Sequence, residues 1–143
     1  MQVRDILNSK GSKVWTVRIG QTLQEALHLL STHRIGALLV LGENNETVGI
    51  LSERDILRNC YKHPTQWFQS RVHAVMTRDI HTVSLDTNLK VVMELMTEKR
   101  TRHILVMEDG KFAGIVSIGD IVKARLEQTE IENEQMRQYI SGI

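Results

Sequence analysis

The apolar and polar positions of the chain follow one order that occurs twice. The pair Thr16-Val17 recurs as Thr82-Val83, and Leu39-Val40 recurs as Leu105-Val106. Because the matches keep their order and nearly constant spacing, we interpret the chain as two copies of a unit of about 65 residues. Two copies are too few for an open solenoid and suit a closed pair.

Each copy predicts the element order β-α-β-β-α. A short strand precedes a helix whose apolar residues recur at three- and four-residue steps, as at Leu23, Ala26 and Leu30. Two strands rich in Val, Ile and Leu follow, and in the second copy Asp109-Gly110 is a strong hairpin signal between them. The expected strands are residues 14–17, 37–41 and 47–51 in the first copy and residues 81–84, 103–107 and 112–116 in the second.

The two copies divide the chain into four parts. We expect a first repeat over residues 1–62, a linker over 63–71, a second repeat over 72–126 and a helical extension over 127–143. The linker contains Pro64, the only proline. The segments that begin the repeats also resemble each other, since Val3, Ile6 and Leu7 match residues 72, 75 and 76. The fold class is therefore mixed α and β.

The last helix is expected from about residue 119 to residue 140. Much of it is polar, so we expect it to project from the core. One face carries a broken apolar line, which is too weak for a coiled coil. A packing strip for a partner subunit and a solvated extension both stay open. The line consists of Val122, Leu126, Thr129, Asn133, Met136 and Ile140.

Composition narrows the classes of function. The 143 residues are 41% apolar and 24% charged, and 18 basic residues balance 17 acidic ones. Without a long block of charge, the chain offers little to a nucleic acid or an acidic membrane. The single cysteine, Cys60, cannot form an internal disulfide, and the longest apolar stretch, residues 37–41, is far too short to cross a bilayer. We expect a soluble, cytoplasmic protein.

The clearest motif is a corner, Gly-apolar-apolar-Ser-x-x-Asp, in which a strand leads into a helix. It occurs at residues 49–55 and again at residues 114–120. Helix capping by Ser and Asp alone accounts for these residue types. The same corner can also serve as the floor of a binding site, because a helix N-terminus suits a phosphate and a carboxylate accepts hydrogen bonds from ribose hydroxyls.

These motifs, together with Arg-Thr-Arg-His-Ile-Leu-Val at residues 100–106, resemble a pair of CBS domains, the module named after cystathionine β-synthase. The resemblance covers about residues 1 to 126 and is greatest for proteins that consist of the two copies alone. It implies two β-α-β-β-α repeats packed sheet to sheet with pseudo-two-fold symmetry, and commonly a homodimer. It also implies a module that binds AMP, ADP, ATP, NAD(H) or S-adenosylmethionine and regulates a partner protein whose identity the sequence does not give.

The family pattern assigns roles to residues in both copies. Asp55 and Asp120 would hold ribose hydroxyls, with Ser52 and Ser117 beside the phosphates. The remaining candidates are Thr16 and Thr82 at the mouths of the first strands, the backbone near Val17 and Val83 for adenine, and Ile50 and Ile115 as apolar walls. We expect no required cofactor, and AMP is the favoured regulatory ligand.

The copies differ where a phosphate would be bound. Arg102 and His103 align with Gly36 and Ala37, and Arg54 is a further cation without a counterpart in the second copy. A charge-assisted contact from arginine contributes about 1.5–3 kcal/mol. We therefore expect two unequal sites, of which the one reached by Arg102 and His103 binds more tightly.

Other chemistry finds little support in the sequence. His28 and His33 are one residue off the spacing that places two imidazoles on one helical face, and we expect no metal site. The sequence contains neither a Gly-x-Ser-x-Gly nucleophile motif nor a Gly-x-x-x-x-Gly-Lys phosphate-binding loop, so we expect that the protein is not an enzyme. A ligand-free dimerisation scaffold, whose corners act as helix caps only, is the main alternative, and a nucleic-acid-binding module is a weaker one.

Overall fold

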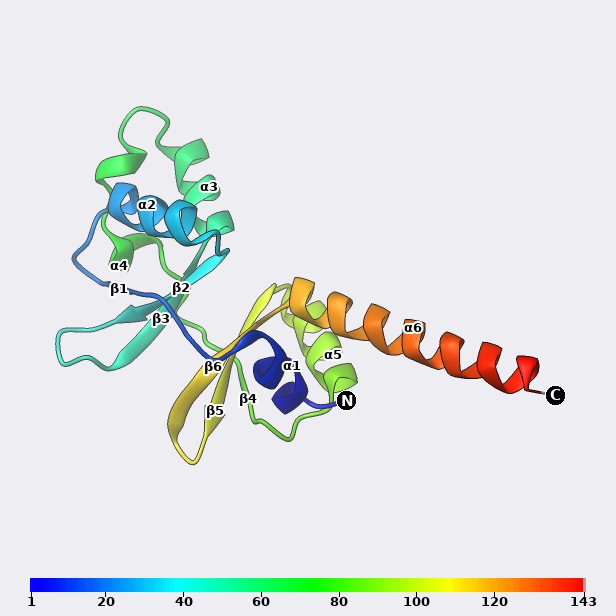
Figure 1. Cartoon of the computed structure of the whole chain (residues 1–143). Coiled ribbons are helices and arrows are strands. Elements are labelled where there is room, and N and C mark those ends of the chain that lie inside the picture. Colours follow the sequence, from blue (N-terminus) through cyan, green and yellow to red (C-terminus); the bar gives the residue numbers. More distant parts are fainter. Residues whose placement is uncertain (143) are drawn as a thin grey trace. The chain divides into compact units, whose positions relative to one another are not determined.

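The computed structural model describes residues 1–142, which form two compact units. The central unit contains residues 13–81, and the terminal unit contains residues 1–12 together with residues 82–142. Each unit has a three-stranded sheet covered by helices (Figure 1). The mixed α and β fold class is therefore confirmed.

The central unit contains one sheet in the order β1-β2-β3. Strands β1 and β2 are parallel, whereas β2 and β3 form an antiparallel hairpin. Parallel strands need a crossover, and the helix α2 supplies it. The elements are β1 (Thr16–Arg18), α2 (Leu23–His33), β2 (Ala37–Leu41), β3 (Thr47–Ser52), α3 (Glu53–Lys62), the 3-10 turn η1 (Trp67–Gln69) and α4 (Val72–Val75).

The terminal unit repeats this topology in its sheet β4-β5-β6, with α5 as the crossover helix. It begins with α1 and ends with α6, the longest helix of the described chain (Figure 1). No helix within residues 1–142 is both long and apolar enough to span a bilayer. The elements are α1 (Val3–Lys10), β4 (Thr82–Val83), α5 (Leu89–Lys99), β5 (His103–Glu108), β6 (Lys111–Ser117) and α6 (Ile118–Ser141).

Local sequence explains why the repeated elements begin and end at equivalent residues. The side chains of Thr22 and Asn88 cap α2 and α5, and each helix ends in a left-handed residue, Arg34 or Arg100, with φ of 52°. The expected hairpin at residues 109–110 is confirmed, because both residues have positive φ, as a tight turn between antiparallel strands requires.

The first strand of each repeat is shorter than expected. The expected strands began at residues 14 and 81, whereas β1 begins at Thr16 and β4 contains only Thr82 and Val83. Trp15 still contributes its carbonyl oxygen to the N–H of Leu39. Its indole stacks on the imidazole of His33 with 3.4 Å between ring centroids, so side-chain packing continues where regular strand pairing stops.

Each unit has its own hydrophobic core, and each core includes the leading segment of the other sequence repeat. Val72 of α4 is fully buried in the central core, beside residues of the first repeat. Residues Val3, Ile6 and Leu7 of α1 are buried in the terminal core with strands of the second repeat. The two compact units are therefore divided differently from the two sequence repeats.

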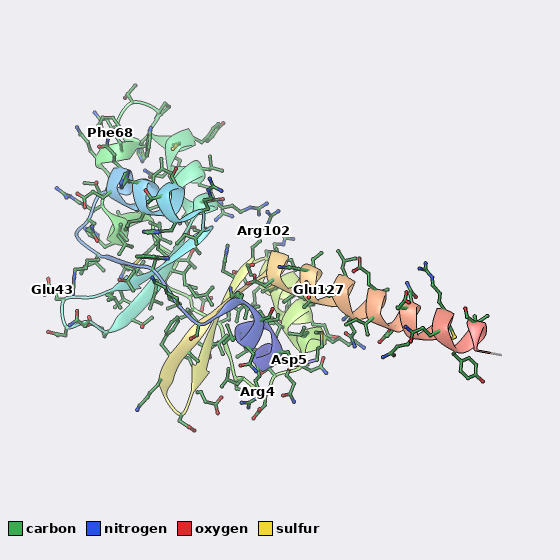
Figure 2. The ribbon with its side chains drawn as sticks, viewed as in Figure 1. Arg4, Asp5, Glu43, Phe68, Arg102 and Glu127 are labelled. Carbon is green, nitrogen blue, oxygen red and sulfur yellow. The ribbon has the colours of Figure 1, made fainter. Side chains whose placement is uncertain are left out.

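Backbone hydrogen bonds fix α1 in the terminal unit. The N–H of Val3 donates to the carbonyl of Thr87, and that of Arg4 donates to the carbonyl of Leu85, both at 2.9 Å. The guanidinium of Arg4, labelled in Figure 2, also forms an exposed ion pair with Asp86. The start of the chain is thus attached to the loop between β4 and α5.

The glycines that begin the two corners allow a matched test of these leading segments. A Cβ at residue 49 would lie 2.7 Å from the carbonyl oxygen of Thr77, whereas one at residue 114 would lie 2.9 Å from the end of the Leu7 side chain. A backbone oxygen that is paired with β3 yields less readily than a leucine methyl. We expect Gly49→Ala to lower the free energy of unfolding by about 1–3 kcal/mol and Gly114→Ala by less, as measured by urea denaturation. Equal losses would contradict this account.

Candidate ligand-binding corners

Both predicted corners are capping boxes, which confirms the structural part of the motif. In the first corner, the N–H of Asp55 donates to Ser52 Oγ at 3.3 Å, and the N–H of Ser52 donates to Asp55 Oδ2 at 2.9 Å. In the second, the N–H of Asp120 donates to Ser117 Oγ at 3.1 Å, and the N–H of Ser117 donates to Asp120 Oδ2 at 2.9 Å. Each carboxylate is therefore held in one orientation at the start of a helix.

In the first corner, Asp55 is enclosed by its own unit. Its exposed fraction is 7%, and both carboxylate oxygens accept hydrogen bonds. Besides the capping contact, Oδ2 accepts from the Ser52 hydroxyl at 3.0 Å, and Oδ1 accepts from the Thr77 hydroxyl at 3.2 Å. The guanidinium of Arg58 lies 3.9 Å from Oδ1. A buried carboxylate needs such partners, so this one acts as a structural anchor here.

Thr77 reaches Asp55 because the chain after α4 pairs with strand β3. The N–H of Ile50 donates to the carbonyl of Thr77 at 3.0 Å, and the N–H of Thr77 donates to the carbonyl of Ile50 at 2.8 Å. This two-bond bridge requires the small residue Gly49 beside it. The glycine of the motif therefore makes room for the protein backbone in this unit.

In the second corner, Asp120 is more accessible and is bound by a lysine. Lys10 Nζ, at the end of α1, lies 2.6 Å from Asp120 Oδ2, and the Asp120 side chain is 24% exposed. Partial burial acts to raise the pKa of Asp120, but the Lys10 ammonium and the N–H of Ser117 lower it by more, so the pKa falls below its ordinary value. Asp120 is thus a charged carboxylate at neutral pH.

The residues that differ between the copies lie next to the corners of their own units. The N–H of Ile118, the first residue of α6, donates to the carbonyl of Arg102 at 2.9 Å, and His103 pairs with Ser117 across the sheet. In the central unit, the N–H of Glu53 donates to the carbonyl of Gly36, and Ala37 pairs with Ser52 across the sheet. Arg102 is exposed beside the start of α6 (Figure 2), so Arg102 and His103 lie beside the second corner, whereas Arg54 lies at the first.

The helix N-termini are less open to a phosphate than the motif alone predicts. In α3, the N–H of Glu53 is bonded to Gly36 and that of Asp55 to Ser52. In α6, the N–H of Ile118 donates to the carbonyl of Arg102, and the N–H of Asp120 donates to Ser117 Oγ. A phosphate at either corner therefore depends more on side-chain cations than on the helix dipole.

The other predicted residues lie in rows across the two sheets. Thr16 pairs with Leu39, which in turn pairs with Ile50, so these three residues share one face. Thr82, Leu105 and Ile115 form the same row in the terminal unit. The side chains of Val17 and Val83 are buried in the helix-covered cores, so only their backbone atoms are available to a ligand. Arg54 is exposed in the first turn of α3.

Two residues at the corners, Thr77 and Lys10, were absent from the sequence-based prediction. Both come from the segments that lead the repeats, and each contacts the corner of the other repeat. The similarity of residues 3–7 to residues 72–76 indicated equivalent roles for these segments. It gave no sign that they are exchanged between units.

A separate hollow in the central unit includes none of the predicted residues. It has a volume of about 260 Å³ and lies at the β2–β3 turn, near Glu43, which Figure 2 labels. Glu43 and Glu46 of the turn line it together with His73 and Arg78. Within residues 1–142, no cluster of His, Cys, Asp and Glu could hold a metal ion.

The Lys10–Asp120 pair gives a testable pH dependence. Because the pKa of Asp120 is lowered in the folded state, the pair stabilises the protein fully above the ordinary carboxyl pKa of 3.8 and loses this effect as the pH falls through the folded-state value. We expect Lys10→Met to cost about 0.5–1 kcal/mol at pH 7 and progressively less in acid, by urea denaturation over a pH series. The exposed Lys90→Met is the control. A loss that stays constant with pH would contradict the assignment.

Comparison with known proteins identifies the family. The family model described as "CBS domain" matches residues 3–62 and 72–127. The mitochondrial CBS domain-containing protein CBSX3 of Arabidopsis thaliana is 34% identical over 98% of this chain and 72% of its own length.

Solved structures agree with this match. A CBS-domain containing protein from Agrobacterium tumefaciens has a TM-score of 0.84 and 37% identity, covering 87% of this chain and 92% of its own. An uncharacterized conserved protein from Pyrococcus horikoshii has a TM-score of 0.72 and 31% identity, covering 78% and 84%. With both sequence repeats matched and the paired corners in place, the chain belongs to the family of CBS-domain proteins.

Proposed function

We propose that the protein is a regulatory module that binds an adenosine-containing ligand and thereby changes the state of a partner protein. Proteins with CBS domains generally act as regulatory modules for adenosine ligands. The observation that carries the proposal is the pair of corners, in which a carboxylate is fixed beside a helix start in each unit. A fixed carboxylate can accept both hydroxyls of a ribose.

The second corner is the better ligand site of the two. Asp55 already accepts hydrogen bonds at both oxygens, and a ribose there would have to displace Thr77 and its paired backbone. Besides its capping contacts, Asp120 forms an ion pair with Lys10, whose side chain is flexible and partly exposed. Displacing a lysine costs less than opening a two-bond backbone bridge. Ribose binding therefore favours Asp120.

Phosphate recognition favours the same corner. The first-turn N–H groups are largely satisfied by protein atoms, so a phosphate needs a cation. Arg102 stands beside the second corner, whereas at the first corner Gly36 occupies the equivalent place and the exposed Arg54 is the candidate cation. Lys10, once released from Asp120, is a further cation within reach of that corner. This combination suits a ligand with one ribose and a short phosphate group, and AMP is the favoured candidate.

Regulation requires that the ligand bind two states of the module with different affinity. We propose that the protein itself catalyses no reaction and that an unidentified partner responds to the module. The cytoplasmic location stays a prediction, since the Arabidopsis relative is named as mitochondrial.

Calorimetric titration with AMP, ATP, NADH and S-adenosylmethionine tests the proposal directly. We expect saturable heat with at least one of the four, and strongest binding with AMP. No heat from any of them, together with purified protein that carries no nucleotide by mass spectrometry, would favour the dimerisation scaffold instead.

A second prediction concerns the inequality of the corners. We expect Asp120→Asn and Arg102→Gln each to weaken AMP binding about 10- to 100-fold, because each removes a charge-assisted contact. Asp55→Asn and Arg100→Gln are the matched controls and should change affinity little. Circular dichroism verifies that all four variants are folded. Equal losses at the two aspartates would show that the corners are equivalent, even if AMP binds.

A further inference from the structure

The C-terminal part of α6 extends beyond the core of its unit. Ile121 and Ala124 are its buried residues, and every described residue after Ala124 is exposed. Figure 1 shows this part as the orange-to-red end of the helix. Large apolar side chains there remain about half to two-thirds exposed: Leu126 59%, Met136 59% and Ile140 63%. A free helix with such side chains lacks the packing that normally stabilises it.

The spacing of these side chains is that of a two-stranded seam. From Val122 to Ile140 the residues of the line alternate steps of four and three, which places Leu126, Asn133 and Ile140 at heptad position a and Val122, Thr129 and Met136 at position d. Ile131 falls at position f and stays outside the seam. The sequence-based judgement that the line is too weak for a coiled coil rested on its two polar members, Thr129 and Asn133.

The two polar members are compatible with a seam. The Thr129 hydroxyl donates to the carbonyl of Arg125 at 3.0 Å within its own helix, which leaves the methyl group for a facing helix. No hydrogen-bond partner for the Asn133 side chain is found in the part of the chain that the structure describes. A single Asn at position a lowers stability but fixes register in a parallel pair, where it meets its own copy.

Charges beside the line have the arrangement that pairing with a second copy of the same helix requires. In a parallel pair, position g of one helix faces position e of the next heptad of the other. Glu132 (g) would then face Arg137 (e), and Arg125 (g) would face Glu130 (e) once its guanidinium turns from Met93 Sδ of its own unit, which lies 3.8 Å away, so each contact joins opposite charges. On the outer face, Gln138 donates to Glu134 of its own helix at 3.4 Å.

We propose that the exposed part of α6 pairs with the same segment of a second chain as a parallel, in-register, two-stranded coiled coil. The proposal commits to one partner, one orientation and one register. It rests on the exposed apolar line and the flanking charges and is independent of the ligand. An antiparallel pair would set position a against position d, so that Asn133 would face Thr129 or Met136 rather than its own copy.

Disulfide trapping in the full chain tests orientation and register. In a Cys60→Ser background, Met136→Cys places a thiol at position d, where it faces its own copy across the axis of a parallel pair. Gln138→Cys, on the outer face, is the control. We expect mild oxidation to convert Met136→Cys mainly to a covalent dimer on a non-reducing gel, with little dimer from Gln138→Cys. No dimer from Met136→Cys, or equal dimer from both, would overturn the proposal.

Charge reversal supplies an independent test by sedimentation equilibrium. In a dimer of Glu132→Arg, two positive charges would meet at positions 132 and 137 of the facing helices, and in a dimer of Arg137→Glu two negative charges would meet there. Each variant alone should therefore self-associate about tenfold more weakly. A mixture of the two, or the double variant, restores opposite charges and should restore association. Glu127→Arg, at outer position b, is the control. If a single reversal has no effect, or if the mixture does not recover, the helix has a different partner.

Discussion

The hydrogen bonds between Ser and Asp at the two strand-to-helix turns are the constraint on which the rest of the structure depends. They fix the residue at which β3 or β6 ends and α3 or α6 begins, and they hold a carboxylate at that point. Capping and binding are compatible roles. A carboxylate that is already oriented by its helix loses little conformational entropy when it accepts a further hydrogen bond.

The corners diverge through the segments that cover them. After α4 the chain adds a backbone bridge to β3 and a hydroxyl to Asp55, which makes the first corner a closed, anchored joint. At the second corner, α1 contributes the flexible side chain of Lys10, which leaves Asp120 partly open. Two copies of one motif thus acquire different chemistry from residues outside the motif.

Much of the fold could be predicted because its signals are local. Runs rich in Val, Ile and Leu predicted the strands, and apolar residues at three- and four-residue steps predicted the helices. Asp109-Gly110 predicted the hairpin, and the Ser-x-x-Asp spacing predicted both capping boxes. The exchange of leading segments could not be predicted, because Val3 and Val72 would fill an equivalent apolar site in either unit. Thr77 and Lys10 were missed for that reason, since their contacts exist only after the exchange. The apolar line of α6 alone does not predict a seam, because two of its members are polar and the argument for pairing also uses the charges beside the line.

The second corner and the exposed tail belong to one helix, which links the two proposals physically. Asp120 lies in the first turn of α6, and Lys10 ties that turn to α1. A ligand that displaces Lys10 from Asp120 would break this tie, so it would change how the base of α6 is held while the seam lies further along the same helix. If the two events are coupled, the coupling is reciprocal: a ligand that alters association must bind the associated and free chains with different affinity. A regulatory module of this size would then need no further element to convert ligand binding into a change in its assembly.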